Sequence, residues 1–147
     1  MSDDPKSIAF VVIEFICLLY LFISGQVIPN NALSFIFMVV GFFIAFWAIW
    51  DMRASTFKLT SAPHHKATLV TTGPYKILRH PMYAGVILVA LSLLFNFFTL
   101  PRLIIFIILC VAFFYEVQHE EGLLKSHFKD QYNAYLKNTF RLIPFVY

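Results

Sequence analysis

The sequence predicts an all-α protein, a multi-pass transmembrane helical bundle of about four membrane segments with a C-terminal amphipathic interfacial helix. Of its 147 residues, 60% are hydrophobic, 13% are charged and 18 are Phe. The mean hydropathy of +0.76 is too high for an ordinary soluble domain. The apolar residues also gather in runs close to the roughly 20 residues that a helix needs to cross a bilayer. We therefore expect residues 1–147 to form a single integral membrane domain.

The first two segments occupy residues 8–28 and 33–50. The Pro-Asn-Asn turn at 29–31 is short and uncharged, so it favours an antiparallel hairpin. Glu14 interrupts the first segment, and a carboxylate in hydrocarbon needs either a partner inside the bundle or a place near the interface. Because Glu14 lies close to the start of its segment, we favour the interface.

The third and fourth segments, 82–98 and 100–115, are each slightly short for an independent span. We expect a tight helical hairpin that tilt or local bilayer thinning accommodates. Polarity then returns, and an amphipathic helix is predicted over 126–138, lying at the membrane interface above the functional site. Its aromatic face carries Phe128, Tyr132 and Tyr135.

The distribution of basic residues predicts the orientation of the bundle. With four spans, both termini lie on one side, together with every Lys and Arg except Arg102. The positive-inside rule places that side in the cytoplasm. The N-terminal MSDDPK lacks the basic start and cleavage site of a secretory signal, so we expect the first segment to be retained.

Several functional classes are not expected from the composition. The net charge of +3 is modest and the basic residues are dispersed, which argues against nucleic-acid binding. Cys17 and Cys110 lie within apolar runs and are expected to be reduced packing residues. His64 and His65 have no further ligands at metal-binding spacing, so no metal site is predicted. Nothing in the sequence fixes an oligomeric state.

The polar stretch 68–85 lies between the apolar segments and is the candidate site. Gly73 and Pro74 predict a turn, and Pro81 disfavours helical geometry in the residue before it. Backbone groups freed near a membrane need partners, which include a bound polar ligand.

Side chains in the same stretch can bind both signs of charge. Arg79 and His80 offer donors to an anion, while Tyr75 and Tyr83 offer aromatic faces to a cation. The alternative is a juxtamembrane basic loop that only fixes the topology.

Two sequence blocks carry a family resemblance. The run GPYKILRHPMYAG resembles the signature of the isoprenylcysteine carboxyl methyltransferase family, which is itself similar to the phospholipid N-methyltransferases. The block from Glu120 to Pro144 resembles that family's closing pattern, with paired Glu, a Tyr-x-x-Tyr and a late Arg-x-x-Pro. Together the blocks span roughly the second half of the chain, in the family's order.

The resemblance implies an S-adenosyl-L-methionine-dependent methyltransferase with a transmembrane fold. It implies that Glu120 holds the cofactor's ammonium group, that His80 and backbone donors hold its carboxylate, and that tyrosines flank the adenosine or the sulfonium. It further implies a lipophilic methyl acceptor that enters from the lipid bilayer. The cofactor-binding residues expected on this basis are Ala67, Thr68, Leu69, Val70, Tyr75, His80, Pro81, Met82, Tyr83 and Glu120.

The acceptor side departs from the family pattern. Isoprenylcysteine enzymes carry an arginine four residues before the cofactor-binding glutamate, and that position here is Glu116. A carboxylate there would repel a carboxylate acceptor but could hold or deprotonate an amine. We expect an acceptor other than a prenylcysteine carboxylate, with Arg79 or Arg141 as the alternative source of a cation. The catalytic candidates are therefore Glu116, Arg79 and Arg141.

Two interpretations from other functional classes remain beside the enzyme. One is a small non-catalytic multi-pass scaffold that assembles with a partner, although such a protein has no need of Arg79, His80, Tyr83 and Glu120 together. The other is a transporter subunit, which would require more charged or broken positions within the spans than Glu14 alone.

Overall fold

The computed structural model describes residues 5–52 and 68–143. They form four helices, α1 (Pro5–Ile23), α2 (Ala32–Met52), α3 (Pro81–Asn96) and α4 (Leu100–Lys137), with a short 3-10 helix, η1 (Gly73–Lys76), before α3. Within these ranges there is no strand, only an isolated parallel bridge between Leu78 and Phe140. The predicted all-α class is confirmed for the described residues.

The helices carry their large apolar side chains on the outside of the bundle. α2 and α4 are long and apolar enough to cross a membrane by length and composition, while α1 and α3 are apolar but shorter. Exposed side chains such as Phe15, Phe43 and Ile107 would face water in a soluble protein. Since lipid is the environment that suits such a surface, the chain is a membrane protein.

Two predicted boundaries were wrong. The first helix ends at Ile23 and not at residue 28, because the chain that follows turns across the end of the bundle. There the Asn96 amide donates to the carbonyls of Gln26 and Ile28 at 2.7 and 2.8 Å. The predicted segments 100–115 and 126–138 are parts of one helix, α4, whose backbone leaves helical geometry only at Lys129 (φ 45°, ψ −114°).

The polar stretch between those two segments was assigned to neither of them. It continues α4 because Glu, Leu and Lys are good helix formers even where hydrophobicity falls. A polarity change therefore marked the end of the apolar part and not the end of the helix.

α2 and α3 approach closely through small residues. A Cβ on Gly41 would lie 2.7 Å from the Gly85 carbonyl oxygen, and a Cβ on Gly85 would lie 2.7 Å from the Gly41 carbonyl oxygen. Farther along the same pair, the Ser92 hydroxyl donates to the Ser34 carbonyl at 2.6 Å. Small residues at such crossings let two backbones pack directly, which is how helices associate in lipid.

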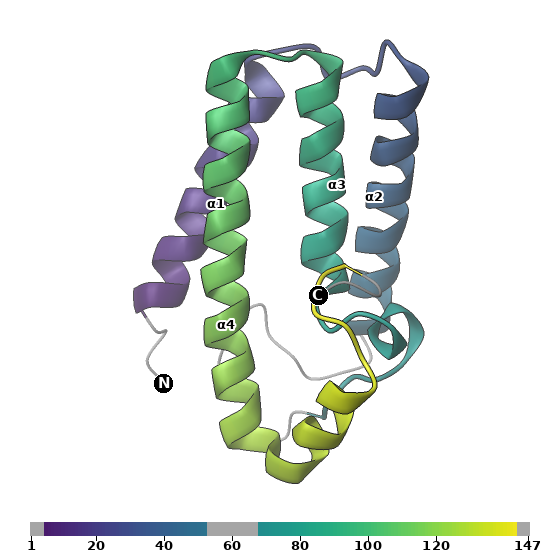
Figure 1. The fold of residues 1–147 in the computed structure, drawn as a ribbon, viewed down its shortest axis with the longest axis vertical. Coiled ribbons are helices and arrows are strands. Elements are labelled where there is room, and N and C mark those ends of the chain that lie inside the picture. The colour runs from purple at the N-terminus through teal and green to yellow at the C-terminus, as the bar shows by residue number, and fades with distance from the viewer. Residues whose placement is uncertain (1–4, 53–67, 144–147) are drawn as a thin grey trace.

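Arg102 joins three helices at the end of the bundle that holds the α3–α4 turn (Figure 1). Its guanidinium is buried and donates to the Ser24 hydroxyl just after α1 and to the Leu93 carbonyl of α3. The one basic residue expected on that side thus makes hydrogen bonds inside the bundle.

The sequence blocks of interest lie at the opposite end. Figure 1 shows the C-terminal end of α2, η1, the N-terminal end of α3 and the chain after α4 gathered there. α4 extends beyond the other helices and then turns back at its Lys129 break, which returns the chain to the start of α3 (Figure 1).

Candidate active site

A glycine fixes the loop that leads into the site. Gly73 has φ +52°, a left-handed conformation that side chains disfavour, and a Cβ there would overlap the Asp51 carboxylate. The Thr72 hydroxyl donates to the same carboxylate at 3.1 Å. The loop is thereby attached to the last turn of α2.

The two sequence blocks are joined through their backbones. The Arg79 amide donates to the Phe140 carbonyl at 2.8 Å, and the Phe140 amide donates to the Ile77 carbonyl at 2.9 Å. The His80 amide follows with a bond to the Arg141 carbonyl at 3.2 Å. These bonds satisfy the irregular backbone before Pro81, and they bring Arg79 and His80 to the end of α4.

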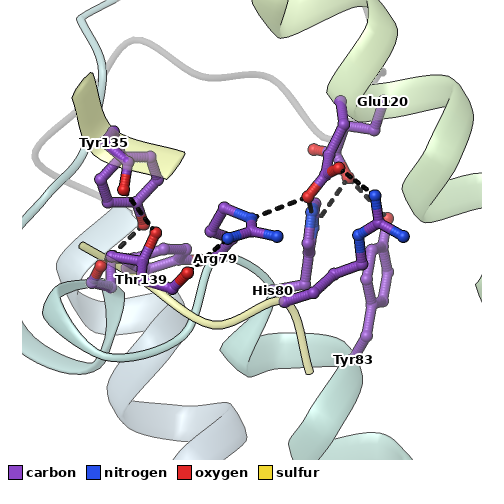
Figure 2. Close-up of polar contacts among 9 residues, drawn as sticks. Arg79, His80, Tyr83, Glu120, Tyr135 and Thr139 are labelled. Carbon is purple, nitrogen blue, oxygen red and sulfur yellow. Dashed lines mark hydrogen bonds and ion pairs between the residues drawn. The ribbon is translucent and has the colours of Figure 1, made fainter. Parts of the chain in front are cut away.

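Glu121 is the centre of an ion cluster between the blocks. Its Oε1 accepts from Arg79 Nε at 2.8 Å, and its Oε2 accepts from Arg141 Nη2 at 2.6 Å. Arg79 also donates through Nη1 to the Thr139 carbonyl (Figure 2). Arg79 therefore links the two blocks, whereas the Arg141–Glu121 pair lies within the second block.

His80 lies between two carboxylates. It is 5% exposed, with Nδ1 3.4 Å from Glu120 Oε2 and Nε2 3.5 Å from Glu121 Oε1. Burial alone would lower its pKa, but the hydrogen bonds and charges of Glu120 and Glu121 outweigh burial and raise the pKa above its usual value. Its ring stacks on Tyr83, with centroids 5.7 Å apart, and the Tyr83 hydroxyl donates to Glu120 at 3.3 Å (Figure 2).

A pocket lies over these groups. It holds about 550 Å³ of empty space, part of it open to the outside, and is formed by α2, the loop before α3, the start of α3 and the later part of α4. Tyr132 closes one wall at 0% exposure, and its hydroxyl has no hydrogen-bond partner within the described ranges. Tyr135 closes another and donates to the Tyr75 carbonyl at 2.7 Å. The lining is completed by Met52, Leu69, Val70, Tyr75, Arg79, His80, Met82, Tyr83, Glu120 and Leu124.

Most of the predicted cofactor-binding residues line this pocket: Leu69, Val70, Tyr75, His80, Met82, Tyr83 and Glu120. Thr68 is exposed and Pro81 is buried as the first residue of α3, and neither is part of the lining. Ala67 lies outside the described residues, as do His64 and His65. Burial raises the pKa of the Tyr75 phenol, so this ring serves as a neutral apolar wall.

The three catalytic candidates lie at different positions relative to the pocket. Arg79 lines the pocket while paired to Glu121, and Arg141 lies behind it on the same carboxylate. Glu116 is one turn before Glu120 on α4, buried at 3% exposure, and faces Glu14 of α1. Glu14 is 8% exposed, so the expectation that it lies at the interface was wrong and the bundle-facing alternative holds.

The sequence did not predict the roles that three residues have in or beside the site. In the sequence, Glu121 was noted only as the second residue of the Glu120–Glu121 pair, and no role of its own was predicted for it. The pairing itself was the signal that could have pointed to Glu121. Tyr132 was assigned to the face of an interfacial helix, whereas it is a buried pocket wall. Glu14 stood out in the sequence because it is a carboxylate within an apolar run. The sequence did not show which residue it would lie beside.

Fold and site together define a helical membrane protein with a pocket at one end of its bundle, beside a cluster of ion pairs. The chain matches the model of the phospholipid methyltransferase family over residues 29–131, and it belongs to that family. It is also similar to protein-S-isoprenylcysteine O-methyltransferase B of Arabidopsis thaliana, with 34% identity over 90 residues. That match covers 60% of this chain and 45% of the relative, so the chain spans less than half of the relative's length.

Proposed function

We propose that this protein is an S-adenosyl-L-methionine-dependent membrane methyltransferase acting on a lipophilic amine. The observation that carries the proposal is the pocket in which residues of both sequence blocks meet around His80 and Glu120. Membership of the phospholipid methyltransferase family supports a methyl-transfer reaction.

The residues of the pocket fit the proposed cofactor. Glu120 offers a carboxylate to an ammonium group, and Tyr75 and Tyr83 offer aromatic faces to adenosine or a sulfonium. The buried Tyr132 hydroxyl, which lacks a partner in the described part of the chain, offers a hydrogen bond that a polar ligand would complete. When bound, the cofactor supplies an activated methyl group.

The protein's own contribution is alignment and exclusion of water. Arg79 and Arg141 fix Glu121, and Glu121 with Glu120 fixes the His80 ring. A pocket with walls held in this way can align two reactants, and proximity of this kind contributes several kcal/mol to a displacement at carbon.

The acid groups on the acceptor side favour an amine over a carboxylate. Glu116 is buried beside Glu14, and no ion pair joins either carboxyl to a cation among the described residues. A carboxylate acceptor brought to this place would meet like charge in a medium of low dielectric. An amine would meet a base that can take its proton.

We place the pocket at the cytoplasmic face, with both termini on that side and the acceptor entering from the bilayer. The distribution of Lys and Arg supports this orientation, since Arg102 alone is expected at the other end. The four-helix arrangement supports a multi-pass topology.

Calorimetric titration of detergent-purified protein with S-adenosyl-L-methionine and its demethylated product tests the proposal. We expect saturable binding that His80→Ala and Glu120→Ala each weaken by at least about tenfold, or 1.4 kcal/mol. His127→Ala and Asp130→Ala, at exposed positions of α4, serve as matched controls. A folded protein that binds neither compound would favour the non-catalytic scaffold.

A further inference from the structure

A second cavity, a groove, lies next to the pocket. It holds about 620 Å³ of empty space, part of it open to the outside. Among the described residues, Tyr135 alone belongs to the lining of both cavities, so its side chain lies between them. The rest of the groove is lined by Thr71, Lys76, Gln131, Ala134, Asn138 and Thr139.

One wall of the groove is the last part of α4, after the break at Lys129. Gln131, Ala134 and Asn138 recur there at spacings of three and four, so they share one face of the helix. Tyr135 follows Ala134 and points about 100° farther round, toward the pocket. The same short helical segment therefore forms a wall of both cavities.

The other wall of the groove is the chain around η1. Thr71 precedes η1 and Lys76 ends it. Tyr75 lies between them in the chain, and its carbonyl accepts the hydrogen bond from the Tyr135 hydroxyl at 2.7 Å. This bond joins the two walls, and a rotation of the Tyr135 side chain that breaks it would connect the groove with the pocket.

The polar groups of the groove are exposed to water or bonded within their own helix. The Asn138 amide donates to the Ala134 carbonyl at 3.1 Å, and the Thr139 hydroxyl donates to the Tyr135 carbonyl at 2.7 Å. Within the described ranges no buried polar atom of the groove lacks a partner, whereas the Tyr132 hydroxyl of the pocket does. The groove thus lets a polar ligand pass, and the pocket offers the group that would hold it.

We propose that the groove is the route by which S-adenosyl-L-methionine reaches the pocket and its demethylated product leaves, with Tyr135 as the gating residue between the two cavities. The inference rests on the proposed function. Elsewhere the pocket lining includes Met52, Leu69 and Leu124, whose apolar side chains would disfavour the passage of a charged nucleoside. Such a surface suits the lipophilic acceptor, so the two reactants have separate entrances.

Binding kinetics distinguish a gating residue from an ordinary ligand contact. Surface plasmon resonance with the full-length protein in detergent measures the association and dissociation rates of S-adenosyl-L-methionine and its demethylated product. Tyr135→Phe keeps the ring and removes the hydrogen bond to Tyr75, so both rates should rise by about two- to tenfold while Kd changes by less than about threefold. Loss of an ordinary contact, as in Glu120→Ala, should raise mainly the dissociation rate.

A bulky group placed in the groove tests the route itself. Ala134→Cys is labelled with a large maleimide, the labelling is verified by mass spectrometry, and both compounds should then associate at least about tenfold more slowly. Asn133→Cys, exposed next to it and outside both linings, is the matched control. Wild-type protein treated with the same reagent accounts for Cys17 and Cys110.

The outcomes separate the inference from the proposed function. An association rate that is unchanged in Tyr135→Phe, or that is equal in the two labelled variants, would overturn the inference and leave the cofactor site in place. A folded wild-type protein that binds neither compound would overturn the proposed function, and the inference with it.

Discussion

Arg79 Nε and Glu121 Oε1 lie 2.8 Å apart, which joins the loop before α3 to the later part of α4. Arg141 completes the cluster on the second oxygen of the same carboxylate. Residues that are far apart in the sequence are thus held at one buried anion, which fixes Arg79 in the wall of the pocket.

Replacing Glu121 by Gln should destabilise the protein strongly. Arg79 and Arg141 would each lose their ion pair with Glu121, and breaking a buried ion pair from one side costs about 3–5 kcal/mol. Thermal unfolding in detergent measures the effect. Asp130→Asn, at an exposed position of the same helix, should leave the unfolding temperature unchanged, and equal unfolding temperatures for the two variants would contradict the prediction.

His80 should make stability depend on pH. Because the pKa of His80 is raised in the folded protein, its contribution is fully present below the unfolded value of about 6.5 and is lost as the pH rises through the folded value. We therefore expect the unfolding temperature to fall as the pH increases from 6.5. His80→Asn should flatten that dependence, and His127→Asn should not. Parallel curves for wild type and His80→Asn would show that His80 is not the responsible group.

Gly85 and Gly122 form a matched pair of helical glycines. A Cβ at Gly85 would lie 2.7 Å from the backbone oxygen of Gly41, while a Cβ at Gly122 would meet nothing within 4 Å. Gly85→Ala should destabilise by about 1–3 kcal/mol through overpacking. Gly122→Ala should stabilise by up to about 1 kcal/mol through helix propensity. Unfolding temperatures of the two variants test the sign, and a shift of both in the same direction would refute the α2–α3 contact.

Tyr132→Phe should lower cofactor affinity without lowering the unfolding temperature. The substitution removes a buried hydroxyl that lacks a partner in the described ranges, so the unfolding temperature should stay the same or rise. Cofactor affinity, measured by calorimetry, should fall about tenfold if the hydroxyl bonds the ligand. Tyr115→Phe, at an exposed position of α4, is the control. Unchanged affinity in Tyr132→Phe would remove this residue from the site.

Hydrophobic patterning was sufficient to predict the all-α class, because each apolar run had to satisfy its own backbone. It was insufficient for α4, where Glu116 to Lys125 stay helical without being apolar. It also misplaced the end of α1, since the bonds from Asn96 that hold the following residues come from a distant helix. Helix ends depended on tertiary contacts that no local pattern encodes.

The two motifs predicted most of the residues that line the pocket. They could not predict the direction in which neighbouring side chains point. Glu120 and Glu121 are adjacent, and neighbours on a helix point about 100° apart. Helical spacing alone could not tell which carboxylate lines the pocket and which binds the arginines, and only the family resemblance singled out Glu120. The Glu14–Glu116 contact depends on how α1 and α4 are aligned, which their apolar surfaces leave unspecified.

The break at Lys129 also sets an order of events during synthesis. By reversing the chain it brings residues 139–141 back to residues 77–80, so the later-made Arg141 supplies a cation for the Glu121 carboxylate made before it. The helices up to this break are therefore complete before Tyr132 and Tyr135 are in place to line the pocket. A message truncated shortly after the codon for Lys129 would yield a chain that keeps its apolar helices but lacks Tyr132 and Tyr135 of the pocket.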